Sequence, residues 1–369
     1  VSIEVDAVRI TASHAAEFNG SVDSVNASAV GGSGAYTDHL VDVWSEVNLG
    51  NNTDIRTYDL VIEATNEVDK PWLDDGKHNV NSGSGGVVDA PAGKSTSEII
   101  DVSKVVIADN SDLDVIGDIY DPGRFSISAY NDIYARDKAK VDSGGAIPVA
   151  GATSKIENTR NDALVTVGNA EFTSVGDMNI FAWSEADIRA EAKANAYGAA
   201  GAAYGDTLAT TYVENVVTIG GGAYLRTEGY LNLLAGCDPE DNRNRYEVEA
   251  YTDLWNKTAT PISDDEGEAI IDQDNRVVVE EFALAEVVKD AYLLAKTGYS
   301  FAEAESTGKD WANALADAIG VDIDGGESTD NENASVTVDG EVRVGIQNYQ
   351  SLLIGYQADG HPDSVIPVN

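Results

Sequence analysis

Val217-Thr218-Ile219 is one copy of a short, valine-led strand signature that returns along the whole chain. The steps between the first valines of successive copies are 58, 60, 52, 60 and 59 residues. Most copies run on into a second alternation of apolar residues. A chain of near-copies of this length is typical of a solenoid, in which each unit packs on the next. The copies are Val47-Asn48-Leu49, Val105-Val106-Ile107, Val165-Thr166-Val167, Val217-Thr218-Ile219, Val277-Val278-Val279 and Val336-Thr337-Val338.

The stretch from Ile188 to Ala196 alternates apolar and polar residues without a break. Ile188 and the alanines at every second position share one face of a strand, and the polar residues between them share the other. A strand that buries only alanine methyl groups needs a close neighbour. The pattern therefore predicts either a flattened coil, whose opposite wall lies close by, or a second sheet.

The periodicity predicts an all-β fold, a parallel β-helix of about six units of about 58 residues. Residues 1–360 form one domain in this interpretation, and residues 361–369 form an extended tail. Segments 69–94, 238–274 and 322–333 are rich in Gly, Asp, Asn or Pro and are predicted to be inserted loops. Residues 280–296 have a helical composition, but they occupy the repeat position of a strand and are predicted to be one. The sequence leaves open whether each unit makes one wide coil or two narrower ones.

One short helix is predicted near residues 309–319, because Trp311, Leu315 and Ile319 recur at helical spacing.

The 369-residue chain has 64 acidic and 23 basic residues, which gives a net charge of −41. This charge excludes nucleic acid as a partner and disfavours anionic membrane surfaces. No apolar run is long enough to span a bilayer, so membrane insertion is not expected. Three interpretations of the acidity remain open. The surface is adapted to high salt, its carboxylates bind calcium, or it is simply a soluble acidic surface.

Three acidic groups are candidate calcium sites, because alternating carboxylates around a glycine turn are typical ligands. None has the spacing of a known consensus. The first contains Asp322, Asp324, Glu327, Asp330 and Glu332; the second contains Asp109, Asp112 and Asp114; the third contains Asp264, Asp265, Glu266 and Glu268.

The sequence shows no motif for catalysis. Gly93-Lys94-Ser95 resembles the end of a phosphate-binding loop, but Val88 stands where the first glycine is required. The four histidines are scattered, and no pair of carboxylates stands out among so many. We therefore predict that the protein is not an enzyme. A polysaccharide lyase or glycosidase of the β-helix type is the third-ranked alternative.

The segment Val175-Gly176-Asp177-Met178-Asn179-Ile180 and the alternating alanines that follow, up to Gly201, are the most distinctive part of the chain. With Gly220-Gly221-Gly222-Ala223-Tyr224-Leu225, they resemble repeats of the large leukotoxin-type filamentous adhesins of bacteria, in the style of filamentous haemagglutinin. The resemblance covers mainly residues 160–236. It implies a secreted right-handed β-helix in an extracellular or cell-surface fibre protein. The chain departs from this pattern in its acidity and in its long predicted loops.

The function predicted from the sequence is that of a structural subunit of an extracellular filament or giant surface protein. The ends of a β-solenoid expose unpaired strand edges, which favours head-to-tail stacking on copies of the same chain. The chain begins in mid-alternation, and we read it as a mature protein or as a piece of a longer one. The alternative is an adhesin or carbohydrate-binding stalk, which would bind a host surface or polysaccharide through segments 69–94 and 238–274. The residues expected to mediate assembly are Val1, Ile3, Val5, Leu352, Leu353, Ile354, Pro362 and Ile366.

Overall fold

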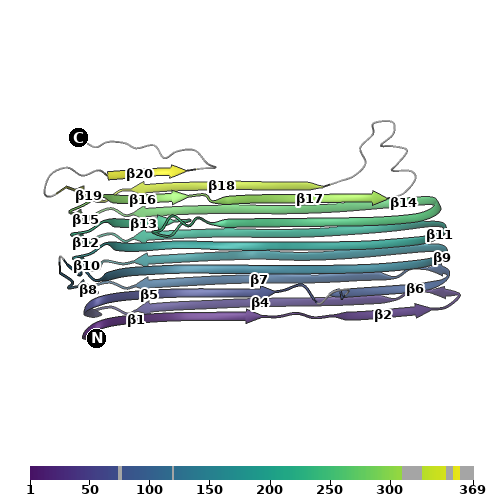
Figure 1. Ribbon diagram of the computed structural model, residues 1–369, viewed down its shortest axis with the longest axis horizontal. Helices are drawn as coiled ribbons and strands as arrows, with labels where there is room; N and C mark the ends of the chain where they lie inside the picture. The colour runs from purple at the N-terminus through teal and green to yellow at the C-terminus, as the bar shows by residue number, and fades with distance from the viewer. Residues whose placement is uncertain (74–76, 119, 310–325, 346–351, 358–369) are drawn as a thin grey trace.

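The computed structural model describes residues 1–73, 77–118, 120–309, 326–345 and 352–357. Every regular element within these ranges is a β-strand, and the named strands pair with one another in parallel. The strands are stacked along one axis, from β1 at the amino-terminal end to β20 at the other (Figure 1). The chain is therefore an all-β, solenoid-like coil, as the alternation predicted.

Three long strands, β9, β11 and β14, pass through the narrow edge of the coil without interruption and contribute to both of its walls. The strand bounds are β1 Ser2–Glu17, β2 Val22–Ala27, β3 Val30–Gly31, β4 Gly34–Leu49, β5 Asp54–Lys70, β6 Val80–Asp89, β7 Ala92–Ile107, β8 Asp112–Val115, β9 Arg124–Val167, β10 Glu171–Ser174, β11 Met178–Ile219, β12 Tyr224–Thr227, β13 Leu231–Ala235, β14 Arg245–Val279, β15 Leu284–Val287, β16 Ala291–Lys296, β17 Tyr299–Lys309, β18 Glu327–Val338, β19 Glu341–Val344 and β20 Leu352–Gln357.

The valine register predicted from the sequence is confirmed at every step. Each first valine pairs directly with the next, beginning with Val47 and Val105 and ending with Val277 and Val336. The residue beside any strand position therefore lies one full sequence period away. Each period makes one wide coil, and the alternative of two narrow coils is excluded. The assignment of residues 280–296 to strands is also confirmed, since β15 and β16 lie there.

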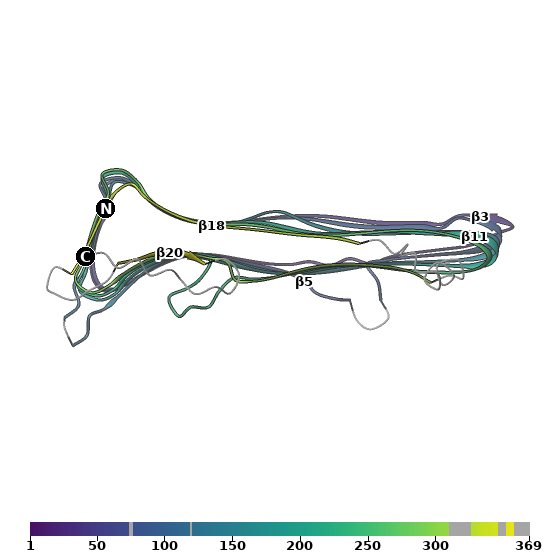
Figure 2. The same cartoon turned by 90° about the horizontal axis from the view of Figure 1, so that it is seen from above.

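Viewed along the axis, each coil is wide at one end and flattened over the rest of its length (Figure 2). We call the wide end the head. Its interior holds stacked rows of large aliphatic and aromatic residues, one of which runs through Ile62, Ile127, Ile180 and Leu233. Because such side chains fill a wide space when they stack, the head carries most of the apolar core.

We call the flattened part the arm, and its two walls lie close together (Figure 2). Ala192, Ala194 and Ala196 are buried there, as the alternation predicted. A Cβ atom added to Gly205 would lie 2.2 Å from Cγ2 of Thr252 and 2.7 Å from Cδ2 of Leu254. Small residues therefore set how closely the two walls approach.

The arm also buries an ion pair. The side chains of Lys70 and Asp137 are fully buried and in contact. The hydroxyls of Ser95 and Ser154 each donate a hydrogen bond of 2.7 Å to the Asp137 carboxylate. Burial lowers the pKa of the Lys70 ammonium, while Asp137 acts in the opposite direction. The carboxylate thus has both a countercharge and hydrogen-bond donors, as a buried charge requires.

A second buried polar contact lies between the head and the arm. Asn66 donates a hydrogen bond of 2.7 Å from Nδ2 to Oδ1 of Asp101, and both side chains are buried. Among the described residues, Oδ1 of Asn66 and Oδ2 of Asp101 have no hydrogen-bond partner. Burial raises the pKa of Asp101 to about 8.

Two predicted loops are wrong over most of their length. Segment 69–94 contains the end of β5, all of β6 and the start of β7, and segment 238–274 falls largely within β14. The glycines and polar residues of both segments lie in ladders with strands of neighbouring coils, so tertiary pairing overrides their local preference for turns. Within these two segments, the described residues that lie outside the strands are 71–73, 77–79, 90–91 and 238–244. Segment 322–333 is likewise a strand from Glu327 onward.

The short helix expected near residues 309–319 falls outside the described residues, apart from Lys309, which ends β17. No described segment is a helix long and apolar enough to cross a membrane.

Candidate functional site

The first predicted calcium group is only partly described. Glu327, Asp330 and Glu332 lie along β18, whereas Asp322 and Asp324 lie outside the described residues. Glu327 and Asp330 are three positions apart on an extended strand, so they project to opposite faces. The turn that was expected to gather these carboxylates is therefore a straight strand from Glu327 onward.

The second group is not gathered around one point either. Asp109 lies in the turn after β7 and accepts a hydrogen bond of 2.8 Å from the backbone N–H of Asn169. Asp114 accepts one of 2.5 Å from Thr173 and lies 3.7 Å from Arg56. Burial raises the pKa of Asp112, and the neighbouring carboxylates of Glu171 and Asp54 add to the effect.

The third group lies on β14, where Asp265 accepts a hydrogen bond of 2.6 Å from Ser306. Across the described part of the chain, no group of three or more His, Cys, Asp or Glu residues is arranged to hold a metal ion.

The residues expected to mediate assembly lie at the two ends of the stack. Val1, Ile3 and Val5 belong to the first coil, where β1 pairs with β5 on one side. Leu352, Leu353 and Ile354 begin β20, which pairs with β16. Among the described residues, no strand covers the other edge of β1 or of β20 (Figure 1). Pro362 and Ile366 lie outside the described residues.

The head core is open at both ends of the axis. Ile3 at one end, and Val342 and Val344 at the other, are only partly buried against that core. Val5 is 49% exposed, although it continues the inward row that contains Thr57 and Val115. In the described part of the chain, both ends therefore present apolar surface and an unpaired strand edge, which favours a further coil as the covering partner.

One outward row along the head alternates in charge for much of its length. From the first coil to the last it contains Glu4, Arg56, Asp114, Thr173, Arg226, Glu286 and Arg343. Arg343 lies 3.2 Å from Glu286 within this row. The row begins with an exposed carboxylate and ends with an exposed guanidinium, so its two ends are complementary.

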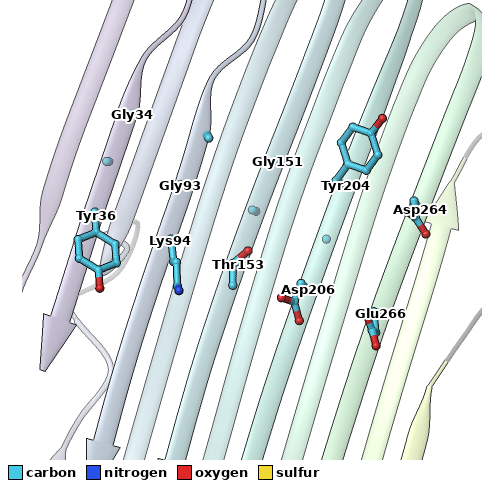
Figure 3. A pocket seen from close by; sticks show the side chains of 14 residues that line it. Gly34, Tyr36, Gly93, Lys94, Gly151, Thr153, Tyr204, Asp206, Asp264 and Glu266 are labelled. Atoms are coloured by element: carbon cyan, nitrogen blue, oxygen red, sulfur yellow. The ribbon is translucent and has the colours of Figure 1, made fainter. Parts of the chain in front are cut away.

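A shallow groove of about 490 Å³ crosses the outer face of the arm at right angles to the strands (Figure 3). Its floor is formed by Gly34, Ala92 and Gly151, which pair in sequence from β4 to β7 to β9. A Cβ atom added to Gly34 or Gly151 would meet no atom within 4 Å. At Gly34 and Gly151 the floor is therefore bare backbone under open space. The sequence analysis missed it, because these residues are adjacent only in the coil register.

Aromatic and polar side chains border this floor. Tyr36, Lys94, Thr153, Asp206 and Glu266 form the next outward row, and Tyr204 closes the floor row beyond Gly151 (Figure 3). Thr96 donates a hydrogen bond of 2.7 Å to Asp38, and this bond, with a smaller contribution from the Tyr36 hydroxyl, lowers the pKa of that carboxyl. Lys94 Nζ lies 6.0 Å from the centre of the Tyr36 ring, and Lys155 pairs with Asp206 at 2.8 Å.

The groove borders the narrow edge of the arm, which carries little charge. In the described part of this edge the one charged residue is Asp89, and its side chain is buried. Val30, Ile147 and Ile262 are exposed along this edge. The edge consists of residues 28–34, 86–92, 144–152, 198–205 and 258–263.

No protein-family model matches the chain, and neither the curated proteins nor the solved structures contain a match to it. The function is therefore argued from the geometry alone.

Proposed function

We propose that this chain is a structural unit of an extracellular filament or giant cell-surface protein, built of about six coils of about 58 residues. In this proposal it stacks head to tail on further coils of the same kind and has no catalytic role. The support that carries it is the pair of open ends. Each exposes part of the head core and a strand edge, and the outward row ends in Glu4 on one side and Arg343 on the other.

The coil register specifies how two copies would meet. One further step of the stack places Ser2–Val5 of a second copy on Glu341–Val344 of the first. Ile3 and Val5 would then continue the inward rows of Val342 and Val344, and Glu4 would lie beside Arg343. Such a contact joins different surfaces of the two copies and propagates into a fibre. The resemblance to filamentous adhesin repeats points in the same direction.

The large negative charge opposes this stacking. A net charge of −41 repels a second copy, so assembly should need salt or a divalent cation such as calcium to screen the carboxylates. We therefore expect fibres under negative-stain electron microscopy in calcium or molar salt and fewer in chelator at low salt. Discrete single particles in all of these conditions would refute the proposal.

A charge swap tests the junction itself. Glu4→Arg and Arg343→Glu should each weaken assembly, because each places like charges side by side across the junction, and the double variant should restore it. Arg226→Glu reverses a charge inside the same row, with Glu286 and Arg343 between it and the nearer end, and should leave assembly unchanged. Sedimentation velocity at fixed salt compares these four variants with the unmodified chain. Single reversals that assemble as well as the unmodified chain would show that copies do not meet in this register.

A further inference from the structure

The groove runs across the outer face of the arm from β4 in the first coil to β14, and it contains none of the head residues at the proposed junction. We propose that it binds a neutral oligosaccharide chain, whose sugar rings lie over the floor of Gly34, Ala92 and Gly151 and stack on Tyr36 and Tyr204. This inference is independent of the proposed assembly and rests on the geometry and chemistry of the groove.

The floor admits a flat ring. Glycine in a strand commonly marks a place where a ligand approaches the backbone closely. Gly34 and Gly151 have open space above them, and Ala92 between them adds only a methyl group. A tyrosine ring stands at each end of this stretch, Tyr36 beside Gly34 and Tyr204 beyond Gly151 (Figure 3). Tyrosine offers an apolar ring face together with a hydroxyl, which suits the C–H faces and hydroxyl groups of a sugar.

The spacing of the groove also suits a chain of sugars. Successive floor residues are one interstrand spacing apart, about 4.8 Å. A pyranose unit in an extended chain is about as long as this spacing, so each coil can present one floor position and one bordering side chain to each sugar. Lys94 and Thr153 supply hydrogen-bond donors, and Asp206 supplies an acceptor.

The surroundings select against other ligands. A peptide strand would need a free backbone edge. Among the described residues, β7, β9 and β11 are paired on both sides along the groove, so such an edge is present only at its two ends, on β4 and β14. Lys94 is the only basic residue that lines it, while Asp206, Asp264 and Glu266 line its far end. With a net charge of −41, this lining disfavours nucleic acids and acidic polysaccharides. A neutral, hydroxylated chain satisfies all of these conditions.

The open floor allows a test that preserves the fold. Gly151→Leu places a side chain into empty space and should fill the groove without strain. Gly144→Leu is the matched control, because Gly144 lies in the same strand, also has no atom within 4 Å of an added Cβ, and does not line the groove. Tyr204→Ala removes one of the two rings.

Binding is measured by saturation-transfer NMR and titration calorimetry with cellohexaose, maltohexaose and the acidic control hexagalacturonate. We expect at least one neutral probe to bind the unmodified chain. Gly151→Leu should abolish this binding, Tyr204→Ala should weaken it about tenfold, and Gly144→Leu should leave it unchanged. Circular dichroism and thermal melting check that each variant is folded.

Three results would overturn the inference: no binding of either neutral probe, binding of hexagalacturonate alone, or neutral binding that survives Gly151→Leu. Sedimentation of the same variants separates the two proposals. Because Gly151 lies on β9, two strands away from the open edge of β4, Gly151→Leu should assemble like the unmodified chain, whichever way the binding result falls.

Discussion

The head and the arm are built from the same parallel strands, yet their interiors hold different residues. The head stacks Ile, Leu, Val and Phe in rows, with buried hydroxyl residues such as Thr57 among them. The walls of the arm lie closer together. Near the head they still bury Ile133 and Ile188, but farther along alanines predominate, and the arm buries polar groups such as Lys70 and Asp137. A wide coil is therefore stabilised by burial of large side chains at one end and by close approach of its walls along the rest.

This difference predicts which substitutions should destabilise each region. In the head, removal of a large side chain leaves a cavity, so its stability depends on filling space. In the arm, the methyl groups contribute less apolar area, and stability depends on small side chains and on satisfied polar groups. Variants with substitutions mostly in the arm test that contrast.

The largest effect is expected at the buried ion pair. Asp137→Asn leaves the Lys70 ammonium buried without a countercharge, which should cost about 3–5 kcal/mol of unfolding free energy. Lys70→Met combined with Asp137→Asn should recover most of this loss, because no unpaired charge remains. The amide oxygen can still accept from one serine hydroxyl, and the amide NH2 can donate to the other. Urea denaturation measures both variants.

The exposed pair Arg9–Glu63, 3.1 Å apart, serves as the control for the buried pair. Glu63→Gln should change stability by less than about 1 kcal/mol, because solvent screens an exposed ion pair. If Asp137→Asn cost no more than Glu63→Gln, the arm would not depend on its buried charges, and the contrast with the head would be wrong on this point.

A smaller effect is expected from added volume in the arm. Gly205→Ala places a Cβ atom against Thr252 and Leu254 of the opposite wall, and the forced separation should cost about 1–3 kcal/mol. Gly151→Ala adds the same methyl group to the outer face of a neighbouring strand, where nothing lies within 4 Å, and should change stability by about 0.5 kcal/mol or less. Equal melting temperatures for the two variants would show that the walls can move apart freely.

The sequence alone specified the register of the valine-led strands, because the valine steps located the pairing of each copy with the next. The alternating alanines after Ile188 predicted a close neighbour, either the opposite wall of a flattened coil or a second sheet, and the structure has the flattened coil. The turn-forming composition of residues 238–274 was misleading, because long parallel ladders hold these residues as a strand. Local preference cannot reveal such a ladder, since its partners lie a full period away.

The groove and the buried polar groups were missed for a related reason. Gly34, Ala92 and Gly151 form a row only after the chain is wound with steps of 58 and 59 residues, and in sequence each is one small residue among many. Asp101 appears in sequence as one more surface acid. Its inward position follows from its pairing with Val43, which is buried. An alignment of the successive coils at the valine register would have revealed both the row of small residues under the groove and the inward position of Asp101.

The last prediction concerns Asp101, the acid buried between the head and the arm. Its pKa of about 8 means that the folded protein holds a proton on this carboxyl at neutral pH. The protonated oxygen can then donate to Oδ1 of Asn66, and both atoms otherwise lack a partner among the described residues. With the 2.7 Å bond from Asn66 to Asp101, this gives a paired acid and amide.

The sign of the pH dependence follows from this proton. In the unfolded chain an aspartate titrates near 3.9, so between about pH 4 and pH 8 the folded state binds one more proton than the unfolded state. The stability from Asp101 is fully present below about pH 4 and is lost as the pH rises to 8, by about 1.4 kcal/mol per pH unit. Asp101→Asn keeps the shape of the protonated acid and can make both hydrogen bonds without a proton. Contributions from the other carboxylates cancel in the difference in unfolding free energy between this variant and the unmodified chain. This difference should therefore grow from pH 5 to pH 8 and then level off. A difference that stays flat over this range would mean that Asp101 is ionised in the folded protein, and that the boundary between head and arm tolerates a buried charge.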